Sequence, residues 1–64
     1  MNRRDFIAHL GTHGCKLHRQ GGRHEIWINP ANGKKSPVPR HRTTKKGIVR
    51  AVCAQLDIPL PGGI

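Results

Sequence analysis

The chain has 64 residues, of which 12 are Lys or Arg and 3 are Asp or Glu, so its formal net charge is +9. A chain of this length forms one domain that buries only roughly 60% of the surface exposed by the unfolded chain, which excludes an enclosed cofactor pocket. The positive charge favours a polyanionic partner, above all nucleic acid. No apolar run is long enough to span a membrane or to act as a signal peptide, so we expect a cytoplasmic protein.

The first 20 residues predict a helix followed by a strand. Asn2 is a suitable N-cap, and glycines at positions 11 and 14 predict where the helix ends. The apolar stripe of this helix consists of Phe6, Ile7 and Leu10. Apolar and polar residues alternate over residues 15–20, which predicts a strand with Cys15 and Leu17 facing the core.

Two further strands are predicted after this one. Gly21-Gly22 lies between two alternating runs, which indicates a hairpin, so residues 23–28 are expected to pair antiparallel with residues 15–20. Residues 35–39 predict a short third strand. Its two prolines lack an N–H donor and therefore confine it to a sheet edge.

The C-terminal part predicts a second helix and a tail. Thr43 or Thr44 is the expected N-cap, and the helix extends to about Leu56. Its apolar face consists of Ile48, Val49, Val52, Cys53 and Leu56. We expect a single domain over residues 1–58 and a flexible tail over residues 59–64, which are rich in Pro and Gly.

The element order is helix, three antiparallel strands, helix, and this order predicts an α+β fold. Both apolar helix faces require the same sheet face, so we expect both helices on one side of a three-stranded antiparallel sheet. This α-β-β-β-α order is the topology of the double-stranded RNA-binding domain, which by itself defines no activity.

Alternation in residues 23–28 predicts which side chains face the core. His24 shares its parity with Ile26 and Ile28, and this would turn all three inward. A twisted Gly-Gly entry would instead turn His24 outward. Trp27 is expected on the open sheet face, where it would stack on an RNA base or contact a partner; the alternative is a ring that covers the rim of a small core.

The two cysteines are expected in the core, without a metal. Cys15 and Cys53 have apolar neighbours, and a disulfide between them is not favoured. Cys15 and His18 form a C-x2-H pair, but alternation places them on opposite faces of a strand, and a structural zinc site needs four ligands. We therefore predict neither a metal nor a cofactor.

Several short motifs together resemble the HicA-type toxins, which are small messenger-RNA interferases of bacterial and archaeal toxin–antitoxin pairs. The resemblance covers nearly the whole chain. It rests on Arg4-Asp5 to Leu10, Gly14, Arg19-Gln20-Gly21-Gly22-Arg23-His24, Val38-Pro39-Arg40-His41 and Lys45-Lys46-Gly47. This chain departs from the family at two positions, since Arg23 replaces the serine of the usual Gly-Ser-His turn and Asp57 replaces a glycine before the final Ile-Pro.

The resemblance implies a metal-independent endoribonuclease that cleaves messenger RNA and is inhibited by a cognate HicB-like antitoxin. It assigns the general base to His24, because histidine exchanges a proton near neutral pH. Arg23, or a neighbouring cation such as Arg19 or Arg40, would stabilise charge on the phosphorane. His41 would protonate the leaving oxygen, or alternatively orient the loop or contact a phosphate.

Clustered cations predict where RNA would bind. The expected RNA-binding residues are Arg19, Lys34, Lys35, Arg40, Arg42, Lys45, Lys46 and Arg50. An alternative function is therefore a non-catalytic RNA-binding module of the same fold, which would bind RNA in a salt-sensitive way without cleaving it. A small basic protein that stabilises ribosomal RNA is a third alternative, although it leaves the Gly-Gly-Arg-His turn unexplained.

Overall fold

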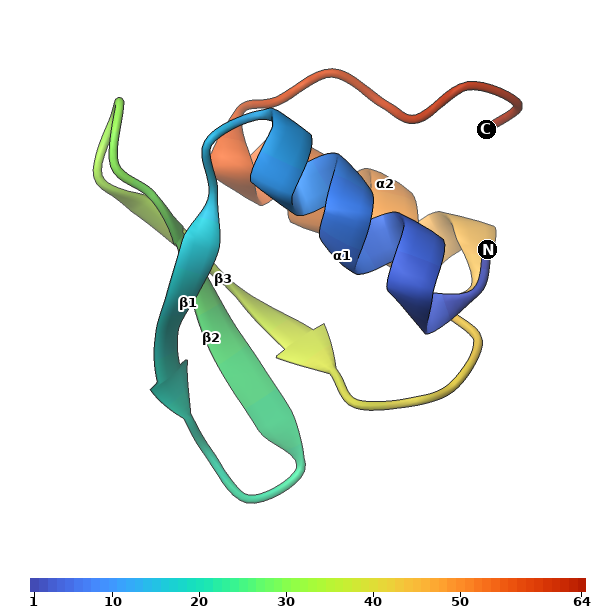
Figure 1. Ribbon diagram of the computed structural model, residues 1–64, viewed down its shortest axis with the longest axis horizontal. Coiled ribbons are helices and arrows are strands. Elements are labelled where there is room, and N and C mark those ends of the chain that lie inside the picture. Colours follow the sequence, from blue (N-terminus) through green and yellow to red (C-terminus); the bar gives the residue numbers. More distant parts are fainter.

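The computed structural model describes residues 1–64 and consists of two helices and one sheet. The elements follow the chain as α1 (Arg3–Thr12), β1 (Lys16–Gln20), β2 (His24–Asn29), β3 (Lys34–Pro39) and α2 (Lys46–Leu56). The strands pair antiparallel in the order β1-β2-β3 (Figure 1). The predicted α-β-β-β-α fold is confirmed, and β3 lies at a sheet edge, where its prolines need no strand partner on one side.

The N-termini of the two helices differ. Asn2 caps α1, because its side-chain oxygen accepts the backbone N–H of Asp5 at 2.8 Å. The predicted cap of α2 was wrong, since the N-cap is Lys45, which makes no side-chain capping hydrogen bond. The two threonines instead lie before the helix and pair through their backbones with the N-terminal segment: Thr43 bridges Asn2, and the Thr44 N–H donates to the Met1 carbonyl at 2.8 Å.

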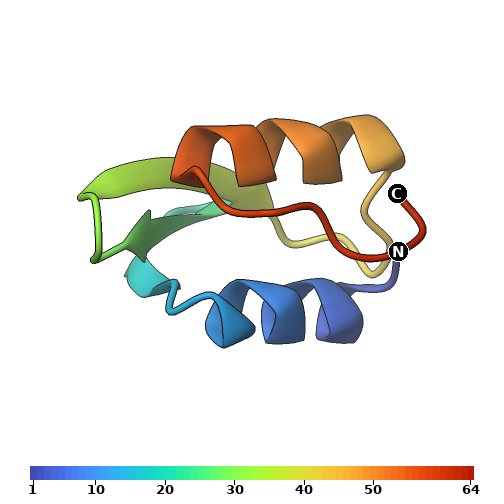
Figure 2. The same ribbon diagram turned by 90° about the horizontal axis from the view of Figure 1, so that it is seen from above.

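Strand β2 has the opposite orientation to the one predicted. Glu25, Trp27 and Asn29 are the buried residues, whereas His24 is exposed and the two isoleucines are half-buried. The two polar residues of this inward stripe can be buried because each has a hydrogen-bond partner. Glu25 accepts a hydrogen bond from Arg3 of α1, and the Asn29 amide donates to the Leu56 carbonyl of α2 at 2.9 Å. Partners in both helices on one stripe confirm that α1 and α2 cover the same sheet face (Figure 2).

The core between the helices and the sheet is small. It consists of Phe6, Leu10, Cys15, Trp27, Val38, Val49, Val52, Cys53 and Leu56. Both cysteines are free and buried, as predicted, and burial raises the pKa of each thiol. Leu17, predicted to face the core, lies opposite Trp27 but is 40% exposed, because β1 is an edge strand whose residues are all exposed.

The C-cap residue that follows helix α2 has the left-handed conformation. This is Asp57, with φ 56° and ψ 52°, at the position where the resemblance would place a glycine. The chain then returns to the other helix, where the Pro59 carbonyl lies 2.7 Å from a ring nitrogen of His9, and Pro61 is buried. The tail therefore begins against α1. The flexibility of residues 59–64 stays a prediction. Neither helix has the length and apolar character needed to cross a membrane.

Candidate active site

A cavity of about 450 Å³ lies at the end of the sheet where β2 begins and β3 ends. It is lined by Arg23, His24, Pro39, His41, Thr43, Thr44, Lys45 and Ile48. The lining residues come from the β1–β2 turn, the start of β2, the end of β3, the β3–α2 loop and the first turn of α2. The structure therefore brings together His24, Arg23, His41 and Lys45, which the sequence analysis had placed in three separate segments.

Strand register explains why the two histidines line one cavity. His24 is the first residue of β2 and pairs with Pro39, the last residue of β3. His41 follows Pro39 by two residues, so the chain leaves the sheet beside the start of β2. His24 is exposed rather than turned toward the core, which corrects the inward orientation expected from its parity. Its imidazole is thus accessible to a substrate.

The cavity is electropositive. Arg23 and Lys45 supply two cations, and no acidic residue lines the cavity. Ile48 lies in the first turn of α2, where the backbone N–H groups carry partial positive charge and no acidic side chain offsets it. Such a helix terminus, combined with neighbouring cations, suits a phosphate group.

A second hollow, of about 510 Å³, adjoins the first through Thr43, which lines both. Four arginines and no hydrophobic residue line it, and its full lining is Asn2, Arg3, Arg4, Arg40, Arg42 and Thr43. Two of these arginines, Arg40 and Arg42, were predicted to bind RNA. Arg3 and Arg4 were missed, because only the pairing of residues 2 and 43 brings the start of α1 to this surface.

The other predicted RNA-binding residues line neither the cavity nor the second hollow. Lys34 and Lys35 begin β3 at the opposite end of the sheet, and Lys34 lies 3.9 Å from Asp57 in an exposed ion pair. Arg19 is exposed on β1 and pairs with Ile26. Exposed cations on α2 complete the set, namely Lys46 and Arg50.

Trp27 does not lie on the open sheet face. It is only 9% exposed, belongs to the core, and its Nε1–H donates to Glu25 at 3.2 Å. The expected open-face position was wrong, and the structure favours the alternative of a ring packed against the small core. The alternation allows either face of the strand to turn inward, and the bulkier indole fills the space under the helices. The open face instead presents Ile26 and Ile28, both half-buried.

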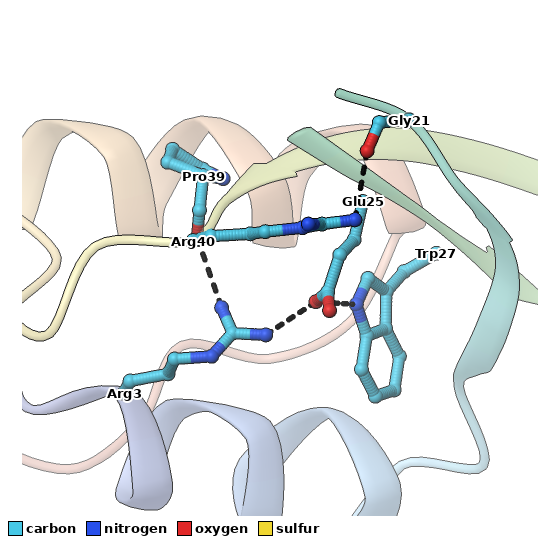
Figure 3. Close-up of polar contacts among 6 residues, drawn as sticks. All are labelled: Arg3, Gly21, Glu25, Trp27, Pro39 and Arg40. Atoms are coloured by element: carbon cyan, nitrogen blue, oxygen red, sulfur yellow. Dashed lines mark hydrogen bonds and ion pairs between the residues drawn. The ribbon is translucent and has the colours of Figure 1, made fainter. Parts of the chain in front are cut away.

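A buried carboxylate beside the cavity organises several polar groups (Figure 3). Glu25 accepts hydrogen bonds from the Arg3 guanidinium and from Trp27, and Arg3 also donates to the Pro39 carbonyl at 3.0 Å. Burial alone would raise the pKa of the Glu25 carboxyl, but these hydrogen bonds and the charges of Arg3 and Arg40 outweigh it and lower the pKa below its ordinary value. The cluster ties α1 to the strand that carries His24.

Gly21 is required where the turn approaches β2. Its N–H donates to the His24 carbonyl at 2.9 Å, and a Cβ at this position would lie 2.8 Å from that same oxygen. We expect Gly21→Ala to destabilise the fold by about 1–3 kcal/mol, because the backbone must shift to relieve the overlap. Gly22→Ala is the matched control, since nothing lies within 4 Å of its Cβ position. Urea unfolding measures both, and equal stabilities would contradict the predicted clash.

The fold and the cavity describe a small basic α-β-β-β-α domain with two histidines and several cations at one end of its sheet. The family model for the HicA toxin of bacterial toxin–antitoxin systems matches residues 3–58. The chain therefore belongs to the HicA toxin family, whose members are messenger-RNA interferases paired with antitoxins. Comparisons with curated proteins and with solved structures gave no match.

Proposed function

We propose that this chain is a metal-independent endoribonuclease that cleaves messenger RNA, with His24 as general base. The observation that supports the proposal is the cavity in which His24, His41, Arg23 and Lys45 converge. RNA cleavage by the substrate's own 2′-hydroxyl uses a base, an acid and positive charge beside the phosphorane, and two imidazoles and two cations are groups that can supply them. Family membership supports the same activity.

The proposed reaction proceeds by transfer within the RNA. The neutral imidazole of His24 accepts the proton of the 2′-hydroxyl as the 2′-oxygen attacks the adjacent phosphorus. Arg23 and Lys45 stabilise the negative charge that builds up on the phosphorane oxygens. The bond from phosphorus to the 5′-oxygen then breaks, and protonated His41 donates a proton to that oxygen. The products are a 2′,3′-cyclic phosphate and a 5′-hydroxyl.

The test is incubation of the purified protein with single-stranded RNA in EDTA, with His24→Ala as the control. The proposal expects cleavage by the wild-type protein in EDTA and fragments with cyclic or 3′-phosphate ends. Cleavage that requires a divalent metal, or that leaves 5′-phosphate ends, would refute the mechanism. Salt-sensitive binding without cleavage would instead support the non-catalytic RNA-binding module, for which Lys45 and Lys46 supply phosphate contacts.

The open sheet face supports the proposal that a HicB-like antitoxin covers it together with His24. Half-buried Ile26 and Ile28 lie next to cations on both neighbouring strands, since Lys16 and Lys35 pair with Ile28. An apolar centre with a basic rim suits an acidic partner surface. We expect Ile28→Glu to abolish antitoxin rescue of growth. Rescue equal to that of the wild-type toxin would show that the antitoxin binds elsewhere.

A further inference from the structure

The guanidinium of Arg40 makes a contact that RNA binding does not require. Its Nη2 donates to the Gly21 carbonyl at 2.7 Å, which joins two positions 19 residues apart (Figure 3). Arg40 follows the last residue of β3, and Gly21 begins the turn that delivers His24. Its neighbour Arg42 lines the same hollow, but no side-chain hydrogen bond engages its guanidinium. The two arginines are therefore not equivalent.

Gly21 is held from both sides. Its N–H donates to the His24 carbonyl at 2.9 Å, which closes the turn, and its carbonyl accepts the hydrogen bond from Arg40. The turn is therefore closed at its base and fastened to the end of β3. Among the long-range side-chain hydrogen bonds, that of Arg40 is the one that reaches this turn.

The segment that carries His41 is anchored independently to the N-terminal part of the chain. The Arg3 N–H donates to the Arg42 carbonyl at 2.7 Å, and Thr44 pairs with Met1. His41 lies between these anchors and the end of β3. Arg40 therefore links a segment fixed by the N-terminal residues to the turn that carries the other histidine.

We propose that Arg40 is a positioning residue that sets the geometry of His24 relative to His41 through the Gly21 carbonyl. The inference rests on the proposed function, because it assigns both histidines to one reaction. Misplacement of a catalytic group by about 1 Å costs up to roughly 100-fold in rate. A charge that only attracts RNA would act on substrate binding and on its salt dependence instead.

The experiment compares Arg40→Gln with the matched control Arg42→Gln. We expect Arg40→Gln to lower kcat by about 10- to 100-fold, with changes in KM and in its salt dependence no larger than those of Arg42→Gln. Arg42→Gln should raise KM and flatten its salt dependence while kcat is kept. A rise in KM with unchanged kcat in Arg40→Gln would overturn the proposal. Loss of the fold in that variant would also overturn it, because Arg40 is exposed.

Amide hydrogen exchange provides a readout that does not depend on activity. Arg40→Gln should speed exchange of the Gly21 amide, which bonds to His24, while amides in the centre of α2 keep their wild-type rates. Unchanged exchange at Gly21 would overturn the proposed anchoring. If the wild-type protein fails to cleave RNA but exchange at Gly21 responds to Arg40→Gln, the proposed function fails while the anchoring holds.

Discussion

Replacing His24 with alanine should lower the rate of RNA cleavage by roughly 10²- to 10⁴-fold, the range that general-base catalysis contributes. His24 is exposed at the first position of β2, so the substitution removes the imidazole without opening a hole in the core. The loss should therefore appear in kcat, while the melting temperature stays near that of the wild type. Single-turnover cleavage in EDTA and thermal unfolding of both proteins measure the two quantities.

A second exposed histidine supplies the control for this prediction. His18 lies on β1 and does not line the cavity, so His18→Ala should cleave RNA at the wild-type rate. Equal losses in both variants would mean that His24 contributes only to general surface properties, which would contradict its role as base.

The assignments of base and acid can be separated with a modified substrate. An RNA with sulfur in place of the bridging 5′-oxygen has a leaving group that needs no proton. His41→Ala should recover most of its lost rate on this RNA, whereas His24→Ala should not, because the 2′-hydroxyl must still lose its proton. Recovery in His24→Ala alone would reverse the two roles.

The elements of the fold were predictable because local signals determine them. The Asn2 cap, Gly14 just after α1, the Gly21-Gly22 turn and the apolar stripe of α2 each act over a few residues. The orientation of β2 was not predictable in this way. Its alternation offers two opposite stripes. The stripe that contains Glu25 can be buried because Arg3, 22 residues away in the chain, donates a hydrogen bond to that carboxylate.

The site was predictable only in part, for the same reason. The role of His24 came from the family resemblance, whereas Arg23 and His41 were candidates because of their chemistry and their places in the sequence. Strand register brings the three residues together. The contributions of Arg3, Thr43 and Thr44 depend on pairing between the first residues and the β3–α2 loop, which leaves no periodic pattern in the sequence. The contact of Arg40 with Gly21 joins two loops that are 19 residues apart, so local sequence patterns do not predict it either.

Replacing Glu25 with alanine should have the largest effect on stability that follows from the polar contacts. The substitution leaves the Arg3 guanidinium and the Trp27 indole N–H without their carboxylate partner. Loss of one partner of a buried ion pair costs about 3–5 kcal/mol, and since the Arg3 side chain is 29% exposed we expect about 2–4 kcal/mol here. A domain of this size has only roughly 3–5 kcal/mol of stability, so much of the variant should be unfolded.

The carboxylate should also make stability depend on pH, and Glu25→Gln isolates that effect because its amide keeps an acceptor oxygen. The pKa of Glu25 in the folded chain lies below its ordinary value, so the unfolded chain binds the proton first as pH falls. The stabilisation is therefore complete above the ordinary pKa of a glutamate and is lost as pH falls through the lower pKa of the folded state. Urea unfolding, followed by the fluorescence of the single tryptophan from neutral to acidic pH, should show a difference between wild type and Glu25→Gln that shrinks on acidification. A difference that stays constant with pH would mean that the carboxylate charge contributes nothing, and that Glu25 acts only as a hydrogen-bond acceptor for Arg3 and Trp27.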